Sequence, residues 1–107
     1  MNELQTGYLD HLYRIVESRK GADADESYIA SLYAKGTHKI AQKLGEEATE
    51  TVIEAVAGNK EGIINESADL IFHWLILLAD QGVTLEEVFE EMHRREGVSG
   101  LTEKANR

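Results

Sequence analysis

Apolar residues recur three and four positions apart along most of this 107-residue chain, which is the spacing of one face of an α-helix. The first such stripe is made of Leu4, Tyr8, Leu9, Leu12, Ile15 and Val16. Proline is absent, so no residue of that type interrupts a helix. The pattern predicts an all-α fold, a bundle of about five helices whose first member covers residues 2–20.

Capping residues and glycines divide the remaining chain into four further helices. Ser27, Thr37 and Thr84 are residue types that accept a hydrogen bond at a helix N-terminus, and Glu87 completes a capping box with Thr84. Gly58 favours a tight turn after the third helix. We therefore expect helices over residues 27–36, 37–57, 60–81 and 84–96.

The fourth predicted helix is apolar on almost every side between Leu70 and Ala79. Such a helix is buried on most sides, and a chain of this length hides only about 60–65% of its unfolded surface by itself. We therefore expect a single domain over residues 1–107, assembled as a homodimer or a higher homo-oligomer. His73 interrupts the apolar run well short of the roughly 18 residues that a membrane span needs, so we expect no membrane. We expect His73, Phe72 and Trp74 in the core; the alternative for His73, which lies one turn after Asp69, is a position close to a functional site.

The charge balance narrows the choice of partners. The chain has 20 acidic and 11 basic residues, a formal net charge of −9, which disfavours binding to nucleic acid or to an anionic membrane. Cysteine is absent, so disulfides and thiol chemistry are excluded. The first ten residues lack the basic and apolar regions of a signal peptide. We expect a cytoplasmic protein.

Two pairs of acidic residues carry the candidate chemistry. Glu47 and Glu50 share one face of the third predicted helix, and Glu66 and Asp69 share one face of the fourth. Glu50 and Glu66 each lie eight residues from Gly58, and the other two acids each lie eleven residues from it. If the two helices form an antiparallel hairpin about that turn, both pairs reach the same level, roughly 12–17 Å from it. Four carboxylates would then face one another.

Facing carboxylates repel unless a cation lies between them. Two unit charges about 5 Å apart repel by about 3 kcal/mol at an effective dielectric of 20. All-oxygen ligands without cysteine favour Mg²⁺, with Mn²⁺ possible, over zinc. Glu46 is either a third ligand, a residue that contacts the ligands without binding the ion, or a surface acid. Lys39 and Lys43 lie on the same helical stripe, where they either hold a polyphosphate or, in the case of Lys43, form an ordinary surface pair.

These residues resemble a known superfamily. Glu-Glu-x-x-Glu at residues 46–50, followed by Glu-x-x-Asp at residues 66–69, is similar to the all-alpha nucleoside triphosphate pyrophosphohydrolases, which include the MazG-like proteins and dimeric dUTPases. More closely, residues 9–95 resemble the phosphoribosyl-ATP pyrophosphohydrolase family of histidine biosynthesis. That likeness rests on Arg19, Ser27-Tyr28 with Leu32, Lys35-Gly36 and the stretches 39–50 and 66–73.

The resemblance implies magnesium-dependent hydrolysis of phosphoribosyl-ATP to phosphoribosyl-AMP and pyrophosphate by a homo-oligomer. It implies that Glu46 or Glu47 orients or deprotonates the attacking water and that Arg19, Lys39 and Lys43 hold phosphate. The implied metal ligands are Glu47, Glu50, Glu66 and Asp69. Two alternatives remain open from the residues alone: a house-cleaning pyrophosphohydrolase that acts on other nucleoside triphosphates, and a non-catalytic helical interaction module.

Overall fold

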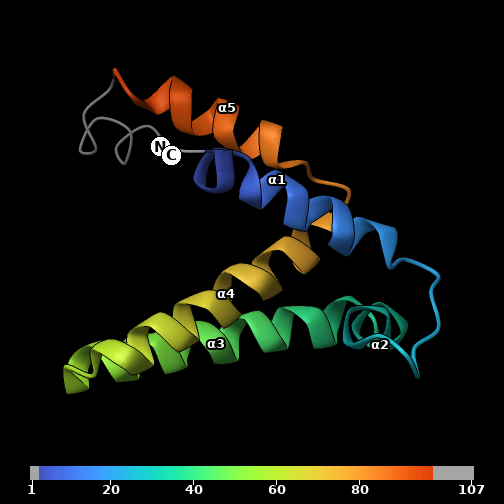
Figure 1. Ribbon diagram of the computed structural model, residues 1–107, viewed down its shortest axis with the longest axis horizontal. Coiled ribbons are helices and arrows are strands. Elements are labelled where there is room, and N and C mark those ends of the chain that lie inside the picture. The colour runs from blue at the N-terminus through green and yellow to red at the C-terminus, as the bar shows by residue number, and fades with distance from the viewer. Residues whose placement is uncertain (1–2, 98–107) are drawn as a thin grey trace.

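The computed structural model describes residues 3–97, and all regular structure in that range is helical. The all-α prediction of about five helices is confirmed. Figure 1 shows α3 and α4 side by side as a long hairpin, with α1 and α5 beyond α4 and α2 packed at one end of α3. The helices are α1 (Glu3–Ser18), α2 (Tyr28–Lys35), α3 (Thr37–Ala57), α4 (Lys60–Asp80) and α5 (Leu85–Arg95).

The turn between α3 and α4 is built by Gly58 and Asn59. Gly58 has a φ of 71°, in the left-handed region that a residue without Cβ adopts at low cost, and its N–H group bonds to carbonyls of the last turn of α3. The side chain of Asn59 then accepts a hydrogen bond from the N–H group of Gly62 and caps α4. This two-residue reversal makes the two helices antiparallel and fixes their register.

Two of the three predicted N-caps are confirmed, and the third is wrong. Ser27 caps α2, and Thr84 forms a complete capping box with Glu87 at the start of α5. Thr37, in contrast, is the first residue inside α3 and caps nothing with its side chain. Its hydroxyl instead donates a 2.7 Å hydrogen bond to Asp80. A tertiary contact with the end of α4 has replaced the local one.

The core surrounds the second half of α4. Leu75, Ile76 and Ala79 of α4 are fully buried, and the other helices pack apolar side chains around them. Two tyrosine hydroxyls also bond to backbone carbonyls of other segments: Tyr13 of α1 donates to Val83 at 2.8 Å, and Tyr33 of α2 donates to Val16 at 3.0 Å. The largest fully buried side chains are Leu32, Ile40, Leu75, Ile76 and Val16.

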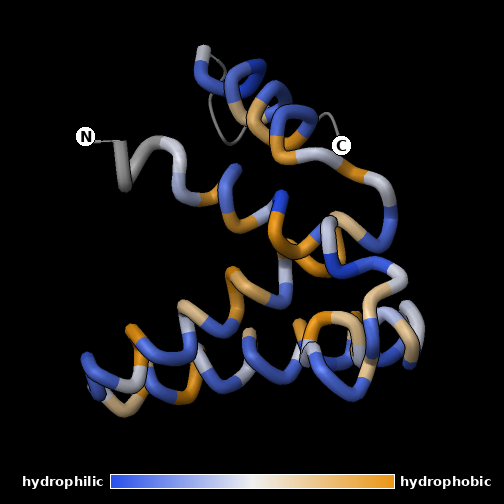
Figure 2. The backbone as a smooth tube through the Cα atoms, turned by 45° about the vertical axis from the view of Figure 1, so that its right-hand side comes forward, coloured by the Kyte–Doolittle hydropathy of each residue, from blue (hydrophilic) through white to orange (hydrophobic). Residues whose placement is uncertain are grey.

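The end of the hairpin near Gly58 extends away from this core (Figure 1). By length and composition alone α4 is apolar enough to cross a membrane, with a mean hydropathy of 1.3 in its most apolar stretch. Glu66 and Asp69 within it would be costly in a bilayer, and α4 packs against both α1 and α3. Those two features favour the core helix of a globular protein. Figure 2 shows apolar positions along α4 and also near the projecting end.

Candidate carboxylate site

Three carboxylates converge across the α3–α4 hairpin. Glu47 of α3 and Glu66 and Asp69 of α4 each offer an oxygen, and these oxygens all lie within 4.8 Å of one another. Glu66 and Asp69 are three residues apart and so lie on one face of α4. Glu47 lies opposite them because it is eleven residues from Gly58, as Asp69 is, and the two helices run antiparallel from that turn. The predicted meeting of the two acidic pairs is thus found for these three residues.

Two of the oxygens in this group are buried and lack a hydrogen-bond donor. Glu47 is only 7% exposed, and within residues 3–97 one oxygen of Glu47 and one of Glu66 have no hydrogen-bond partner. Ionised carboxylates only accept hydrogen bonds, so two of them cannot satisfy each other. A buried acceptor without a donor costs on the order of 1–3 kcal/mol, and more when it is charged. The site therefore favours a proton or a cation between these side chains.

Glu50 approaches this group from the side. It is exposed and lies outside the three-oxygen group, but its carboxyl group contacts that of Glu66. The carboxyl groups of Glu50 and Glu47, together with burial, raise the pKa of Glu66 to about 7. A carboxyl group that keeps its proton near neutral pH is the electrostatic signature of crowded negative charge. All four predicted ligands therefore interact, three of them within one group.

Basic side chains precede acidic ones where α3 leads into the site. Lys43 lies 3.2 Å from Glu46 and 3.8 Å from Glu47, so it bridges the two acids. Glu46 also accepts a 2.8 Å hydrogen bond from Gln42. The hydrogen bonds from Gln42 and Lys43, with the nearby charge of Lys39, lower the pKa of Glu46. Glu46 points to these partners on the surface of α3 and is not among the three converging carboxylates.

Arg19 lies apart from the carboxylates. It is exposed just after the end of α1, where it donates a hydrogen bond to Ser18 at 3.2 Å. No contact among the described residues joins it to the carboxylate group. Its predicted role in holding phosphate stays a prediction.

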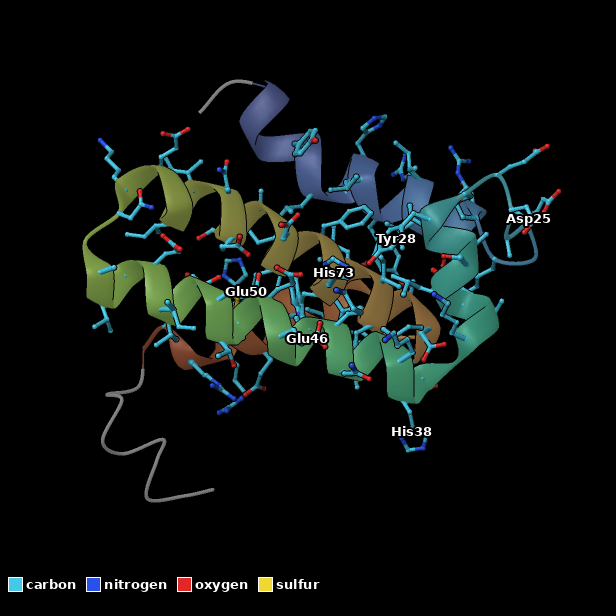
Figure 3. All side chains as sticks on the ribbon, turned by 90° about the horizontal axis from the view of Figure 1, so that it is seen from below. Asp25, Tyr28, His38, Glu46, Glu50 and His73 are labelled. Carbon is cyan, nitrogen blue, oxygen red and sulfur yellow. The ribbon has the colours of Figure 1, made fainter. Side chains whose placement is uncertain are left out.

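Sequence reasoning placed His73 in the core and gave no role to Tyr28 beyond family likeness. His73 is indeed buried, at 4% exposure, but its ring nitrogens hydrogen-bond to the backbone oxygen of Asp69 at 2.7 Å and to the hydroxyl of Tyr28 at 2.8 Å. Figure 3 shows Tyr28 and His73 next to one another between α2 and α4, with Glu46 and Glu50 on α3. The only signal in the sequence was the position of His73, one turn after Asp69.

The donor set fits a hard divalent cation. All the converging atoms are carboxylate oxygens, which are the ligands of Mg²⁺, Mn²⁺ and Ca²⁺ in proteins. Two of these side chains carry a buried oxygen without a donor, and a cation would satisfy both. Lys43 alone reaches only one side of Glu47. The residues present therefore suit a divalent ion better than an isolated ion pair.

The raised pKa of Glu66 predicts how pH changes stability without metal. Its pKa near 7 in the folded chain lies above the ordinary value of 4.5, so the folded state binds this proton more tightly. The resulting stabilisation is fully present below about pH 4.5 and is lost as pH rises through about 7. In urea unfolding with chelator from pH 5 to pH 8, Glu66→Gln should remove this dependence. The difference in unfolding free energy between variant and parent should then grow in favour of the variant as pH rises.

Glu90→Gln, which changes an exposed acid of α5, is the matched control and should follow the parent across the same range. A constant difference between Glu66→Gln and the parent at every pH would contradict the assignment.

Known proteins are similar to this chain over nearly its full length. Residues 9–96 match the family model described as phosphoribosyl-ATP pyrophosphohydrolase. The chain is 56% identical over 102 residues to a phosphoribosyl-ATP pyrophosphatase of Rhizorhabdus wittichii, an overlap of 95% of this chain and 96% of that protein. It is 57% identical over 99 residues to that of Parvibaculum lavamentivorans, covering 92% and 91% of the two chains. For Geobacter metallireducens the identity is 51% over 107 residues, covering 100% and 97%. The chain therefore belongs to the phosphoribosyl-ATP pyrophosphohydrolase family.

Proposed function

We propose that this protein hydrolyses phosphoribosyl-ATP to phosphoribosyl-AMP and pyrophosphate, in the cytoplasm, as a step of histidine biosynthesis. The observation that carries the proposal is the three-carboxylate group of Glu47, Glu66 and Asp69, found in a chain whose family model and relatives are named for this activity. In this reaction water attacks a phosphorus of the anhydride between the α and β phosphates. The phosphorus–oxygen bond of that anhydride breaks, one product takes the oxygen of the water, the other keeps the bridging oxygen, and one proton is released.

Glu47, Glu50, Glu66 and Asp69 are proposed to hold Mg²⁺, with Mn²⁺ as the substitute that the same oxygen donors accept. When bound, the ion screens the charge of the polyphosphate and lowers the pKa of a water molecule. The pair of buried oxygens without donors supports this assignment. So does the raised pKa of Glu66, because crowded carboxylates favour a cation among them.

Side chains of α3 would act on the attacking water and on the phosphates. Glu46 and Glu47 are the candidates for orienting or deprotonating the water. Glu47 belongs to the carboxylate group, while Glu46 lies on the surface beside Lys43, and hydrogen bonds from Gln42 and Lys43 lower its pKa. Lys39 and Lys43 are proposed to bind phosphate oxygens, and Arg19 to contact a more distant part of the substrate.

The test of the function is pyrophosphate release over a substrate panel. With millimolar magnesium, the parent should release pyrophosphate from phosphoribosyl-ATP with a kcat/KM at least about tenfold above that for ATP, dUTP or other nucleoside triphosphates, a margin that about 1.4 kcal/mol of differential binding supplies. Chelator should abolish release. Equal or better cleavage of another triphosphate would assign the chain to house-cleaning instead, and no metal-dependent release would leave an interaction module.

The proposed ligands predict a link between charge and magnesium. Asp69→Asn removes one of the facing charges at nearly constant shape. Without metal, the variant should be as stable as the parent or more stable, by less than about 1 kcal/mol because water screens the exposed carboxylate. Magnesium at ten times its dissociation constant should stabilise the parent by about 1.4 kcal/mol. The variant should lose most of that gain, and turnover should fall about 100-fold or more.

Urea unfolding with chelator and with magnesium measures both stability terms. Asp25→Asn, which makes the same change in the exposed loop before α2, is the control and should keep the full magnesium effect. Equal stabilisation of the parent and Asp69→Asn by magnesium would remove Asp69 from the ligand set.

We further propose that the projecting part of the hairpin packs against a second copy of the chain. The radius of gyration is 15.9 Å, against about 13 Å for a compact domain of this length. Val56 is 85% exposed and Ile64 is 59% exposed, on the two sides of the turn. Val52, Ile53 and Ile71 extend this exposed apolar surface. It leads into an apolar groove of 460 Å³ lined by Leu44, Ala48, Leu70, Ile71 and Trp74.

Light scattering at micromolar concentration should give the mass of a dimer or a larger homo-oligomer. Val56→Glu should shift that mass towards the monomer, since a buried charge would oppose association. It should leave helix content unchanged, because Val56 is 85% exposed within one chain. Met92→Glu, an equally drastic change at a 60% exposed position on α5, is the control and should keep the parent's mass. A parent that is monomeric at this concentration would contradict the proposal.

A further inference from the structure

A histidine on α4 fixes the direction of a tyrosine hydroxyl beside the carboxylates. His73 and Tyr28 are 45 residues apart in sequence, and their side chains lie 2.8 Å apart. The other ring nitrogen, Nδ1, is 2.7 Å from the backbone oxygen of Asp69. His73 is 4% exposed while Tyr28 is 50% exposed, so a buried group anchors a side chain that reaches solvent.

The donor and acceptor in each of these hydrogen bonds determine whether the tyrosine oxygen can donate or accept a further one. A carbonyl oxygen can only accept, so Nδ1 of His73 carries the hydrogen that bonds to Asp69. In the neutral ring Nε2 is then the acceptor, and the hydroxyl of Tyr28 must donate to it. The oxygen of Tyr28 keeps only lone pairs for other partners. It can accept a hydrogen bond from a hydroxyl or ammonium group, whereas it would repel a phosphate oxygen.

The ring of Tyr28 is also held in place. It stacks on Phe72, with ring centroids 6.3 Å apart and an interplanar angle of 18°, and meets His73 edge-on at 5.8 Å. Packing on Phe72 and the hydrogen bond to His73 together fix both the ring and its hydroxyl. A half-exposed side chain with so little freedom is prepared to bind a ligand at low entropic cost.

Tyr28 lies on the side of the carboxylates that suits an anionic substrate. On α4, His73 follows Glu66 and Asp69 along one face, away from the turn and towards α2. Lys43 is nearby: its pKa is raised mainly by the hydrogen bond to Glu46, and Tyr28 is among the smaller causes. In the opposite direction, α3 continues towards the turn with the exposed acid Glu50, which would repel phosphate. A polyphosphate nucleotide at the carboxylates would therefore extend past Lys43 towards Tyr28. Figure 3 shows Tyr28 and His73 on the α2 side of Glu46 and Glu50.

We propose that Tyr28 binds the nucleoside part of the substrate, its hydroxyl oxygen accepting a hydrogen bond from a sugar hydroxyl, and that His73 is the positioning residue that fixes this oxygen as an acceptor. The proposal rests on the function proposed above. It assigns the nucleoside to the α2 end of the site and the phosphates to Lys43 and the carboxylates. The two ribose rings of phosphoribosyl-ATP supply the hydroxyl donors that an acceptor-only oxygen needs.

The direct test is binding of phosphoribosyl-AMP, measured by calorimetry in the presence of chelator, so that no metal and no turnover enter. Tyr28→Phe keeps the ring and removes only the oxygen. It should raise the dissociation constant by about three- to tenfold, the usual loss for one neutral hydrogen bond. Tyr8→Phe is the matched control, since Tyr8 is similarly exposed, at 48%, on α1, and it should bind like the parent.

Kinetics separate the nucleoside side from the phosphate side. With phosphoribosyl-ATP and magnesium, Tyr28→Phe should raise KM by about the same three- to tenfold, the loss of one neutral hydrogen bond, and change kcat less. Inhibition by pyrophosphate should match that of the parent, because the tyrosine oxygen does not contact phosphate. A loss of pyrophosphate inhibition in Tyr28→Phe would overturn the assignment of the nucleoside to this residue.

The role of His73 is tested by a double-mutant cycle on phosphoribosyl-AMP binding. If His73 acts through Tyr28, His73→Phe weakens binding about as much as Tyr28→Phe does, and the double variant is no weaker than either. Additive losses would mean that His73 acts only on the fold. Since His73 is buried and its replacement risks unfolding, Tyr28→Phe alone also decides the main proposal.

The two proposals can fail separately. A parent that binds phosphoribosyl-AMP and cleaves phosphoribosyl-ATP, with Tyr28→Phe identical to it in both assays, would overturn the assignment of Tyr28 and leave the function intact. A parent that neither binds nor cleaves these compounds would overturn the function and this inference together.

Discussion

Carboxylates that face one another across the α3–α4 hairpin are the constraint on which the rest of the molecule depends. The turn at Gly58 sets the register that brings Glu47 opposite Glu66 and Asp69. In the part of the chain that the structure describes, no donor satisfies one buried oxygen of Glu47 and one of Glu66. Their mutual repulsion opposes the same contacts that form the hairpin. The apolar half of α4 holds the arrangement against that repulsion, because Leu75, Ile76 and their neighbours lock α4 among the other helices. Core and site thus occupy successive stretches of one helix.

The charge on the side of α3 that carries Glu47 changes sign along the helix. On one stripe of this helix, Lys39 and Lys43 precede Glu47 and Glu50, so the stripe turns from basic to acidic within one turn. Lys43 forms ion pairs with both Glu46 and Glu47 and so lies at the boundary. A substrate whose phosphates meet the acids through a cation and whose remaining charge meets the lysines has only one direction in which to lie. That direction leads to α2, which carries Tyr28, the residue proposed above to bind the nucleoside.

Features set by local spacing were predictable from the sequence. Helical periodicity gave the five helices, and counting residues from Gly58 gave the meeting of Glu47 with Glu66 and Asp69, because a hairpin with a two-residue turn leaves little freedom in register. Features set by tertiary contact were not. Thr37 is of a residue type that often caps helices, yet its hydroxyl donates a hydrogen bond to Asp80, 43 residues away. Glu46 shares a motif with Glu47 but turns to Gln42 and Lys43, since adjacent helical residues point about 100° apart.

The contact between Tyr28 and His73 could not be predicted from the sequence, because it joins residues 45 positions apart. A histidine within an apolar run is expected in the core, and His73 is buried, with 4% of its surface exposed. What the run does not reveal is that its two nitrogens join the backbone at Asp69 to a hydroxyl on α2. The bonds also explain how a polar ring is accommodated in the core: both nitrogens have partners, so burial leaves neither unsatisfied. Any movement of α2 against α4 would break one of these bonds. The ring therefore couples the position of α2 to α4, the helix that carries Glu66 and Asp69. A change in how these two helices pack in the core would then also change the geometry of the candidate site.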